Sequence, residues 1–584
     1  MRRLLPLAAI VTLAFAVLTS RSADAPPDPL RFVPETADMV VKLERPRALV
    51  EAALGLPLVK QLQGFEAFQE FYDSTNARRF YQLIAYFEKE LGAKWPELLD
   101  RLAGGGAVLA NLKFEVKDPT AALIIIQSKD EALLRRFVDV AVKLVEAEQT
   151  RNDAKERIQR GKYRDIDIYQ VGKDVQAAVV GSTLVIGITE QAFHDALDRH
   201  LDGGKQSLAN AARVAEARRL LPADAFAWLW VNVENARKLP GSKEALNAEA
   251  TDPPQTILFG GWLDQFRRAP FVAAALAPSE QGFVLTVRTP VGRDGMNEGL
   301  AGLHLPSADQ GGTLPLLEPK GVLFSMSYIL DLHQFWEQRA KILNAEQVKG
   351  FEEVDRQSGK VLGGNKLSWL MTAAGAQQRF VAAQASKAGY KTKAGQPIPA
   401  FASVLSMRDP KTFSPAIETA LRTAALGGLA AAKMKLVEEK HGDLTIVGWR
   451  FPEEDETLEL AVGDVRFNFA PCFVSVGNQF VISSTFELAH ELIDILKQEA
   501  KGDAKKAATA MQMRFYPSGA ADYLQATEEQ LLAATVLDRA LAPQEAKEQV
   551  KKFIELVRKS GAVQIEQEYG AKDFRFDIKL TPAK

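Results

Sequence analysis

One histidine–aspartate pair occurs twice in this sequence at the same spacing. His194 and Asp198 are four residues apart on an expected helix and so share one helix face, and His490 and Asp494 repeat the pair. A carboxylate can orient an imidazole for metal binding or proton transfer, so the pairs suggest a metal-dependent hydrolase. The alternative is a surface pair inherited through duplication, which we favour because no second histidine stands at a ligand spacing.

Motifs typical of catalysis are missing elsewhere. The sequence contains no GxSxG, SxxK, GxGxxG, Walker A, HExxH or CxxC motif. The single cysteine, Cys472, excludes an intrachain disulfide and a cysteine-based zinc site, and its apolar strand predicts a buried, inert thiol. We therefore expect a protein that is not an enzyme and uses no cofactor, although a catalyst assembled from scattered residues would leave no motif.

Two groups of aromatic residues are candidates for binding an apolar ligand. Residues 65–87 carry eight phenylalanines and tyrosines at helical spacing, among them Phe65, Phe68 and Tyr72. Such a stripe is usually the buried face of a helix, and the alternative is a ligand groove. Trp228 and Trp230 alternate along an expected strand, where they could bind a sugar or a lipid but are more typical of core packing.

Two stretches of nineteen residues indicate a tandem duplication. Residues 180–198 and 476–494 share seven identities at a constant offset. In both, a glycine turn precedes an apolar strand, a threonine suited to cap a helix, and an amphipathic helix. Weaker correspondences in the same order extend over most of the chain.

The pattern predicts an α+β fold repeated in two domains. Expected strands come as neighbours joined by short turns, with helices grouped between them, which favours antiparallel sheet. We expect a first repeat at 26–300, a Gly- and Pro-containing linker at 301–314 and a second repeat at 315–584. Continuous apolar strands at 123–126 and 271–276 indicate sheet covered on both faces, and the charged connector 150–162 is most simply a helix extension.

The first residues of the chain read as an export signal. Arg2 and Arg3 precede an apolar run at 4–18, and Ala23-Asp24-Ala25 provides the small–x–small pattern of a signal peptidase site. We expect a Sec-type signal peptide at 1–25, cleavage after Ala25, and a periplasmic or extracellular protein. No later apolar run is long enough to span a membrane, and 72 basic against 74 acidic residues do not indicate nucleic-acid binding.

A short motif links the chain to a known group of proteins. Val33-Pro34-Glu35-Thr36-Ala37 and Leu221-Pro222-Ala223-Asp224-Ala225 each lead a proline turn into an apolar strand. With the export signal and the low cysteine content, the chain resembles large exported proteins of unknown function from planctomycete-type bacteria. The resemblance implies a location in the cell envelope and no activity.

Three functions follow from these observations. The first is a non-enzymatic envelope protein that binds a protein partner or has a structural role. The second is a carrier that holds an apolar ligand against the aromatic helix or in a sheet-lined cavity. The third is the metal-dependent hydrolase that the histidine–aspartate pairs suggest.

Overall fold

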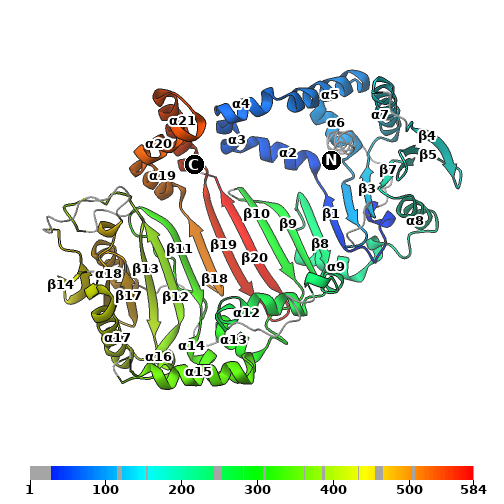
Figure 1. Ribbon diagram of the computed structural model, residues 1–584. Coiled ribbons are helices and arrows are strands. Elements are labelled where there is room, and N and C mark those ends of the chain that lie inside the picture. The colour runs from blue at the N-terminus through cyan, green and yellow to red at the C-terminus, as the bar shows by residue number, and fades with distance from the viewer. Residues whose placement is uncertain are drawn as a thin grey trace. The chain divides into compact units, whose positions relative to one another are not determined.

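Figure 1 shows a computed structural model of the chain. It describes residues 28–114, 121–152, 156–242, 253–280, 282–306, 311–360, 362, 364–384, 389–392, 394–431, 433–453, 465–502 and 507–582. The expected signal peptide, 1–25, lies outside them. The chain divides into two compact units, Met1–Asn247 with Arg268–Pro290, and Ala248–Arg267 with Val291–Lys584. Helices hold 46% of the chain and antiparallel strands 27%, so the predicted α+β class is confirmed.

The first unit is built on one antiparallel sheet. Its strands follow each other across the sheet in the order β4-β5-β6-β7-β3-β2-β1-β8-β9-β10. Their bounds are β1 Met39–Leu43, β2 Ala107–Asn111, β3 Ala122–Gln127, β4 Gln159–Tyr163, β5 Ile166–Val171, β6 Val175–Val180, β7 Thr183–Gly187, β8 Ala227–Asn232, β9 Phe271–Ser279 and β10 Gly282–Thr289.

Helices pack on both faces of this sheet, over different strands. α8 and α9 pack with β1, β8 and β9 in one core. α5, α6 and α7 pack on the opposite face, over β3 and β7. The helices of this unit are η1 Pro29–Phe32, α2 Pro46–Gly55, α3 Pro57–Leu62, α4 Glu66–Asp73, α5 Thr75–Leu91, α6 Trp95–Leu102, α7 Glu131–Arg151, α8 Glu190–Leu201, η2 Leu208–Asn210, α9 Ala212–Leu220 and α10 Val233–Ala236.

The second unit has a sheet of the same design. The strand order is β14-β15-β16-β17-β13-β12-β11-β18-β19-β20, again antiparallel throughout. The bounds are β11 Val322–Ile329, β12 Ala374–Ala383, β13 Ala400–Met407, β14 Lys435–His441, β15 Leu444–Arg450, β16 Cys472–Val476, β17 Gln479–Ser483, β18 Met511–Phe515, β19 Ala562–Tyr569 and β20 Phe574–Thr581.

The helices of the second unit repeat the same uneven cover. α18 packs on one face of β13, β16 and β17, and α16 and α17 pack on the other. Figure 1 shows α14–α16 at one end of the sheet and α19–α21 at the other. The helices are α12 Pro253–Arg268, α13 Glu298–His304, α14 Leu332–Ile342, α15 Ala345–Ser358, α16 Leu367–Ala373, α17 Pro410–Ala431, η3 Arg466–Asn468, α18 Phe486–Lys501, α19 Pro517–Ala526, α20 Glu528–Arg539 and α21 Pro543–Arg558.

Both units therefore have one strand order and the same division of helices between the faces. A duplicated domain would produce this correspondence, and the duplication itself stays a prediction. The repeated stretches form equivalent elements: β7 leads to α8 and β17 leads to α18. The expected threonine caps are confirmed, since the Thr189 side chain accepts from Ala192 N and the Thr485 side chain accepts from Leu488 N.

The sequence suggested that the charged connector, 150–162, extends a helix, and this is wrong. α7 ends at Arg151, and residues 159–163 form β4, an edge strand with exposed side chains such as Arg160 and Lys162. An edge strand that is open on both sides has no buried positions, so its sequence lacks the alternation by which strands are recognised.

The expected linker is partly folded into the second unit. Residues 298–304 form α13, and the side chains of Leu303 and Leu305 are buried. Along the sequence, the chain passes from the first unit to the second between residues 290 and 291, before this helix.

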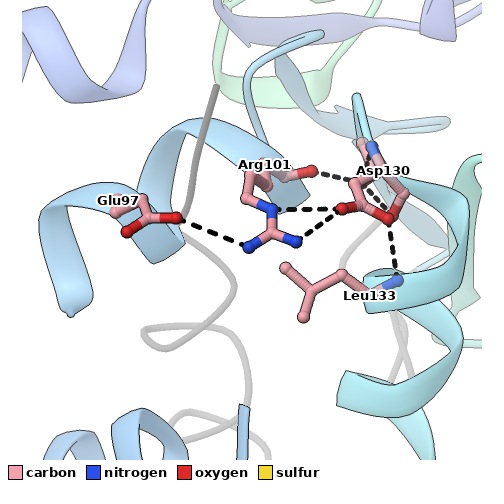
Figure 2. A network of polar contacts seen from close by, with 5 residues as sticks. Glu97, Arg101, Asp130 and Leu133 are labelled. Atoms are coloured by element: carbon pink, nitrogen blue, oxygen red, sulfur yellow. Dashed lines mark hydrogen bonds and ion pairs between the residues drawn. The ribbon is translucent and has the colours of Figure 1, made fainter. Parts of the chain in front are cut away.

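Polar contacts fix the junction of α6 and α7 in the first unit. In Figure 2 the Arg101 guanidinium donates from Nε and Nη2 to Asp130 Oδ2 at 3.0 and 2.9 Å, and from Nη1 to Glu97. The other oxygen of Asp130 accepts from Leu133 N and caps α7. One carboxylate thus both starts α7 and holds the end of α6.

Candidate functional site

The part of each sheet that helices leave open is apolar. In the first unit this surface, the first apolar face, comprises alternate residues of β1, β2, β8, β9 and β10, which the register places on one side. Its members are Met39, Val41, Leu109, Leu229, Ala274, Leu276 and Leu285. Leu109 is 45% exposed and Leu285 40%, and the other members are half-buried.

The second unit has an equivalent surface, rich in phenylalanine and methionine. This second apolar face consists of Phe324, Met326, Phe380, Phe401, Met513, Phe515, Ile565 and Ile578. Phe401 is 43% exposed and Phe515 45%. The rings follow one another across β18, β11, β12 and β13: centroids of Phe515 and Phe324 are 4.9 Å apart, those of Phe324 and Phe380 6.1 Å, and those of Phe380 and Phe401 6.4 Å.

The charged side chains of β18, β19 and β20 lie on the opposite side of the sheet. Arg514, Gln564 and Lys579 stand opposite one another in register, and Lys579 pairs with Glu566 at 2.6 Å. None of the positions named for the two apolar faces is charged. In an ordinary surface sheet the apolar side is covered and only the polar side meets water, whereas here apolar side chains such as Phe515 are also exposed.

These two faces were missed by the sequence reasoning. The apolar run at 271–276 predicted a sheet covered on both sides, and this is wrong for β9: Phe271, Ala273 and Ala275 are buried, whereas Val272 and Ala274 are half-buried on the open side. A sequence records that a side chain is apolar and does not record what covers it. The faces could have been found from the sequence by noting apolar strands for which it predicts no amphipathic helix to cover them.

Both tryptophans lie on the covered side of β8. Trp228 and Trp230 are buried in the core of the first unit, and Trp228 Nε1 donates to Glu44 at 2.7 Å. Their rings face away from the first apolar face, because neighbouring strand residues such as Leu229 point to the other side.

The aromatic stripe on α4 and α5 is mostly not a buried helix face. Phe65, Phe68 and Tyr72 are half-buried, and Phe71 is 64% exposed. Tyr72 stacks on Tyr81 at 5.5 Å, and burial, followed by the hydrogen bond with Tyr72, raises the pKa of Tyr81 to about 12. The expectation of a core holds only near the end of α5.

That end of α5 meets the rest of the first unit. Phe87 is buried and contacts Phe137 of α7 at 5.1 Å. Earlier residues of α5 pack against α4 and leave their outer ring edges in solvent. The stripe is therefore a cluster of contacting rings on a pair of helices. It gives the first unit a further exposed apolar surface, separate from the first apolar face.

The first histidine–aspartate pair holds a hairpin. Tyr163, at the end of β4, stacks on His194 with centroids 3.9 Å apart, and its hydroxyl donates to Asp198 Oδ2 at 2.8 Å. Arg164 donates to the other oxygen of Asp198 at 2.7 Å. The Arg164 hydrogen bond is the main reason that the pKa of Asp198 is lowered. The pair thus attaches the β4–β5 turn to α8.

The second pair makes the same attachment with a different ring. His441, at the end of β14, stacks on His490 with centroids 4.7 Å apart, and its Nε2 donates to Asp494 Oδ1 at 2.8 Å. His490 Nε2 lies 3.8 Å from Glu439. Across the described part of the chain, no group of three or more His, Cys, Asp or Glu side chains is placed to hold a metal ion. Tyr163 and His441 were not recognised as partners, since their pairing depends on the hairpins.

The second unit also contains a cavity of about 380 Å³ next to α12, α13 and α14. Leu263, Leu300 and Ile342 line it together with Asp264 and Lys341. Lys341 is paired with Glu298. This mixed lining suits an apolar ligand less well than the two open faces do.

Cys472 is buried, and burial raises its pKa far above the usual range of a thiol, so it is not a nucleophile at neutral pH.

Comparisons with known proteins give no family for this chain. No family model matches it, and no curated protein matches it significantly. Among solved structures, crystal form I of a protein named TP0453 matches at 13% identity and a TM-score of 0.23, covering 47% of this chain and 83% of that one. Crystal form III matches at 10% identity and the same TM-score. Such low scores carry no argument. No helix among the described residues is long and apolar enough to cross a membrane.

Proposed function

We propose that this is an exported, non-enzymatic binding protein that holds apolar ligands on the two open sheet faces. The observation that carries the proposal is the distribution of charge on β18–β20, where Phe515, Met513 and Ile565 share one side and Arg514 and Glu566 the other. A contiguous apolar surface in water is costly, and surfaces of this kind mark interaction sites.

The energetics favour an occupant without charge. Covering a phenylalanine or methionine side chain stabilises a complex by about 1.5–3 kcal/mol before the cost of association. A charged ligand group on such a surface would lose hydration without gaining a partner, because the faces offer none. Methionine adapts to irregular shapes, which suits a small apolar molecule better than one fixed protein surface.

The export signal agrees with this function. A carrier of water-insoluble molecules is needed where they must cross an aqueous compartment, and residues 1–25 have the pattern of a signal peptide. The histidine–aspartate pairs take no part in the proposal, because their side chains are engaged with Tyr163, Arg164 and His441.

The test is binding of N-phenyl-1-naphthylamine, an uncharged probe that fluoresces in apolar surroundings. We expect saturable binding by the whole protein. Phe515→Glu and Leu109→Glu, made together, should weaken it at least about tenfold, because each places an unpaired charge on a face.

The matched control is Leu537→Glu. It makes the same kind of change at an exposed leucine of α20, which is 81% accessible and is not a member of either face, and should leave probe affinity unchanged. Absence of probe binding, or equal binding by the double variant and the wild type, would show that the faces are not ligand sites.

A further inference from the structure

The second apolar face ends in a row of uncharged polar side chains. Tyr328 of β11 stands opposite Gln378 of β12 on one side and Met511 of β18 on the other, and Met511 stands opposite Gln567 of β19. Tyr328 lies two residues beyond Met326 and Gln378 two residues before Phe380, so both point to the side of the sheet that carries the face.

Two polar groups in this row lack hydrogen-bond partners among the described residues. Gln378 is only 4% exposed; its Nε2 donates to Gly375 O at 2.8 Å, while its Oε1 accepts nothing there. The Tyr328 hydroxyl makes no hydrogen bond with described residues, and burial raises the pKa of Tyr328. A buried acceptor without a partner is uncommon in folded proteins and indicates that something else satisfies it.

The chemistry of the row selects one kind of ligand end. Tyr328 offers a hydroxyl donor that also accepts, and Gln378 offers a carbonyl acceptor. The nearest charged residues along the chain, Arg379 and Asp331, are paired with Glu499 and Arg408 respectively. A carboxylate or an ammonium group would therefore lie here without a counter-charge, whereas an alcohol could donate to Gln378 Oε1 and accept from Tyr328.

We infer that the second apolar face binds long-chain or ring alcohols, with the ligand hydroxyl at Tyr328 and Gln378 and the hydrocarbon along the phenylalanine row. This inference rests on the proposed function and names the ligand class for one of its two faces. Phe324 and Met326 lead from the polar row into that row of rings on the same strand.

The test is displacement of N-phenyl-1-naphthylamine from the Leu109→Glu variant, in which the second face alone reports. Dodecanol, dodecanoate and dodecylammonium share one chain and differ in the end group. Dodecanol should displace the probe at about a tenfold lower concentration than either ion. Tyr328→Phe should reduce this advantage to about threefold or less.

Tyr516→Phe is the control, since it removes a hydroxyl bonded to Glu318 rather than one in the row, and it should keep the full preference. Equal displacement by the three compounds, or a preference that survives Tyr328→Phe, overturns the inference and leaves the proposed function intact. Failure of the probe to bind at all contradicts the proposed function instead.

Discussion

Tyr163 and His441 occupy equivalent places at the ends of β4 and β14, and each lays its ring on a histidine and bonds an aspartate. The recurrence of His194 and His490 is explained by this attachment. Each contact joins a hairpin to the helix that follows the repeated strand. This structural role accounts for the recurrence of both the histidine and the aspartate.

The stacked ring and the histidine should be energetically coupled. In a double-mutant cycle of Tyr163→Ala and His194→Ala, we expect a coupling free energy of about 0.5 kcal/mol, because the contact is partly exposed. Hydrogen exchange of the β4–β5 amides would measure it. Tyr86→Ala, an exposed tyrosine outside the hairpin, should be additive with His194→Ala. Additivity in the Tyr163 cycle as well would refute the attachment.

Two other histidines should make stability depend on pH. Desolvation by burial lowers the pKa of His304 and of His200 from 6.5 to about 4, and His200 stacks on Phe32 at 4.2 Å. The unfolded chain therefore takes up protons before the folded chain does. Stability from these residues is complete above pH 6.5 and is lost as pH falls through the folded pKa.

Urea unfolding at about pH 7 and about pH 4.5 would measure this loss. We expect His304→Gln to reduce the fall in unfolding free energy by about 2 kcal/mol, since its amide does not titrate in this range. A variant that loses stability with acid as steeply as the wild type would show that His304 does not contribute.

At the level of elements, close approach of α19 to β11 depends on a glycine. A Cβ on Gly519 would lie 2.0 Å from Val322 O, whereas a Cβ on Gly350, within α15, would meet nothing within 4 Å. Gly519→Ala should destabilise the protein by about 2 kcal/mol or more. Gly350→Ala should stabilise it by up to about 1 kcal/mol, because alanine is the better helix former. Urea midpoints that rank the two variants otherwise would contradict this packing.

Local patterns predicted the elements well where burial alternates or a cap is present. Thr189 and Thr485 start their helices as expected, and β8 alternates between covered and open residues. Patterns failed for β4, where every position but one is exposed, and for the stripe on α4 and α5, where rings pack on one another. In both cases the outcome depends on neighbours that are distant in sequence.

The candidate site was harder to predict than the fold. The residues chosen from the sequence are bulky or titratable, such as Trp230 and His194, and the fold uses them for its core and its hairpins. The open faces consist of ordinary residues such as Val41 and Met513, which look like core residues in any sequence. Only the register of the strands reveals that these side chains share one side of each sheet, where they are half-buried or exposed.

At the scale of the whole molecule, the two units share a strand order and differ in the lining of their open faces. The first face is aliphatic and the second is rich in aromatic rings and methionine. If the chain arose by duplication, the copies diverged at these faces as elsewhere, and two ligand preferences in one protein would follow.

The expected signal peptide makes a prediction about the mature chain. Expressed with its first residues in a bacterium with a Sec system, the protein should appear outside the cytoplasm with a mass that begins at Pro26. Ala23→Leu with Ala25→Leu should block cleavage and leave the full-length mass, because the peptidase requires small residues at these positions. If the exported wild-type protein still began at Met1, the prediction of a cleaved signal peptide would be contradicted.

The charged edge strands have a consequence for the colloidal behaviour of the empty protein. β4 ends one sheet with Arg160 and Lys162, and β14 ends the other with Lys435, Glu438 and Lys440, all exposed. Charged side chains at these edges oppose the addition of a further strand. Ligand-free protein at high concentration should therefore associate through its apolar faces, into clusters that a mild detergent disperses and that do not bind thioflavin, rather than into fibrils.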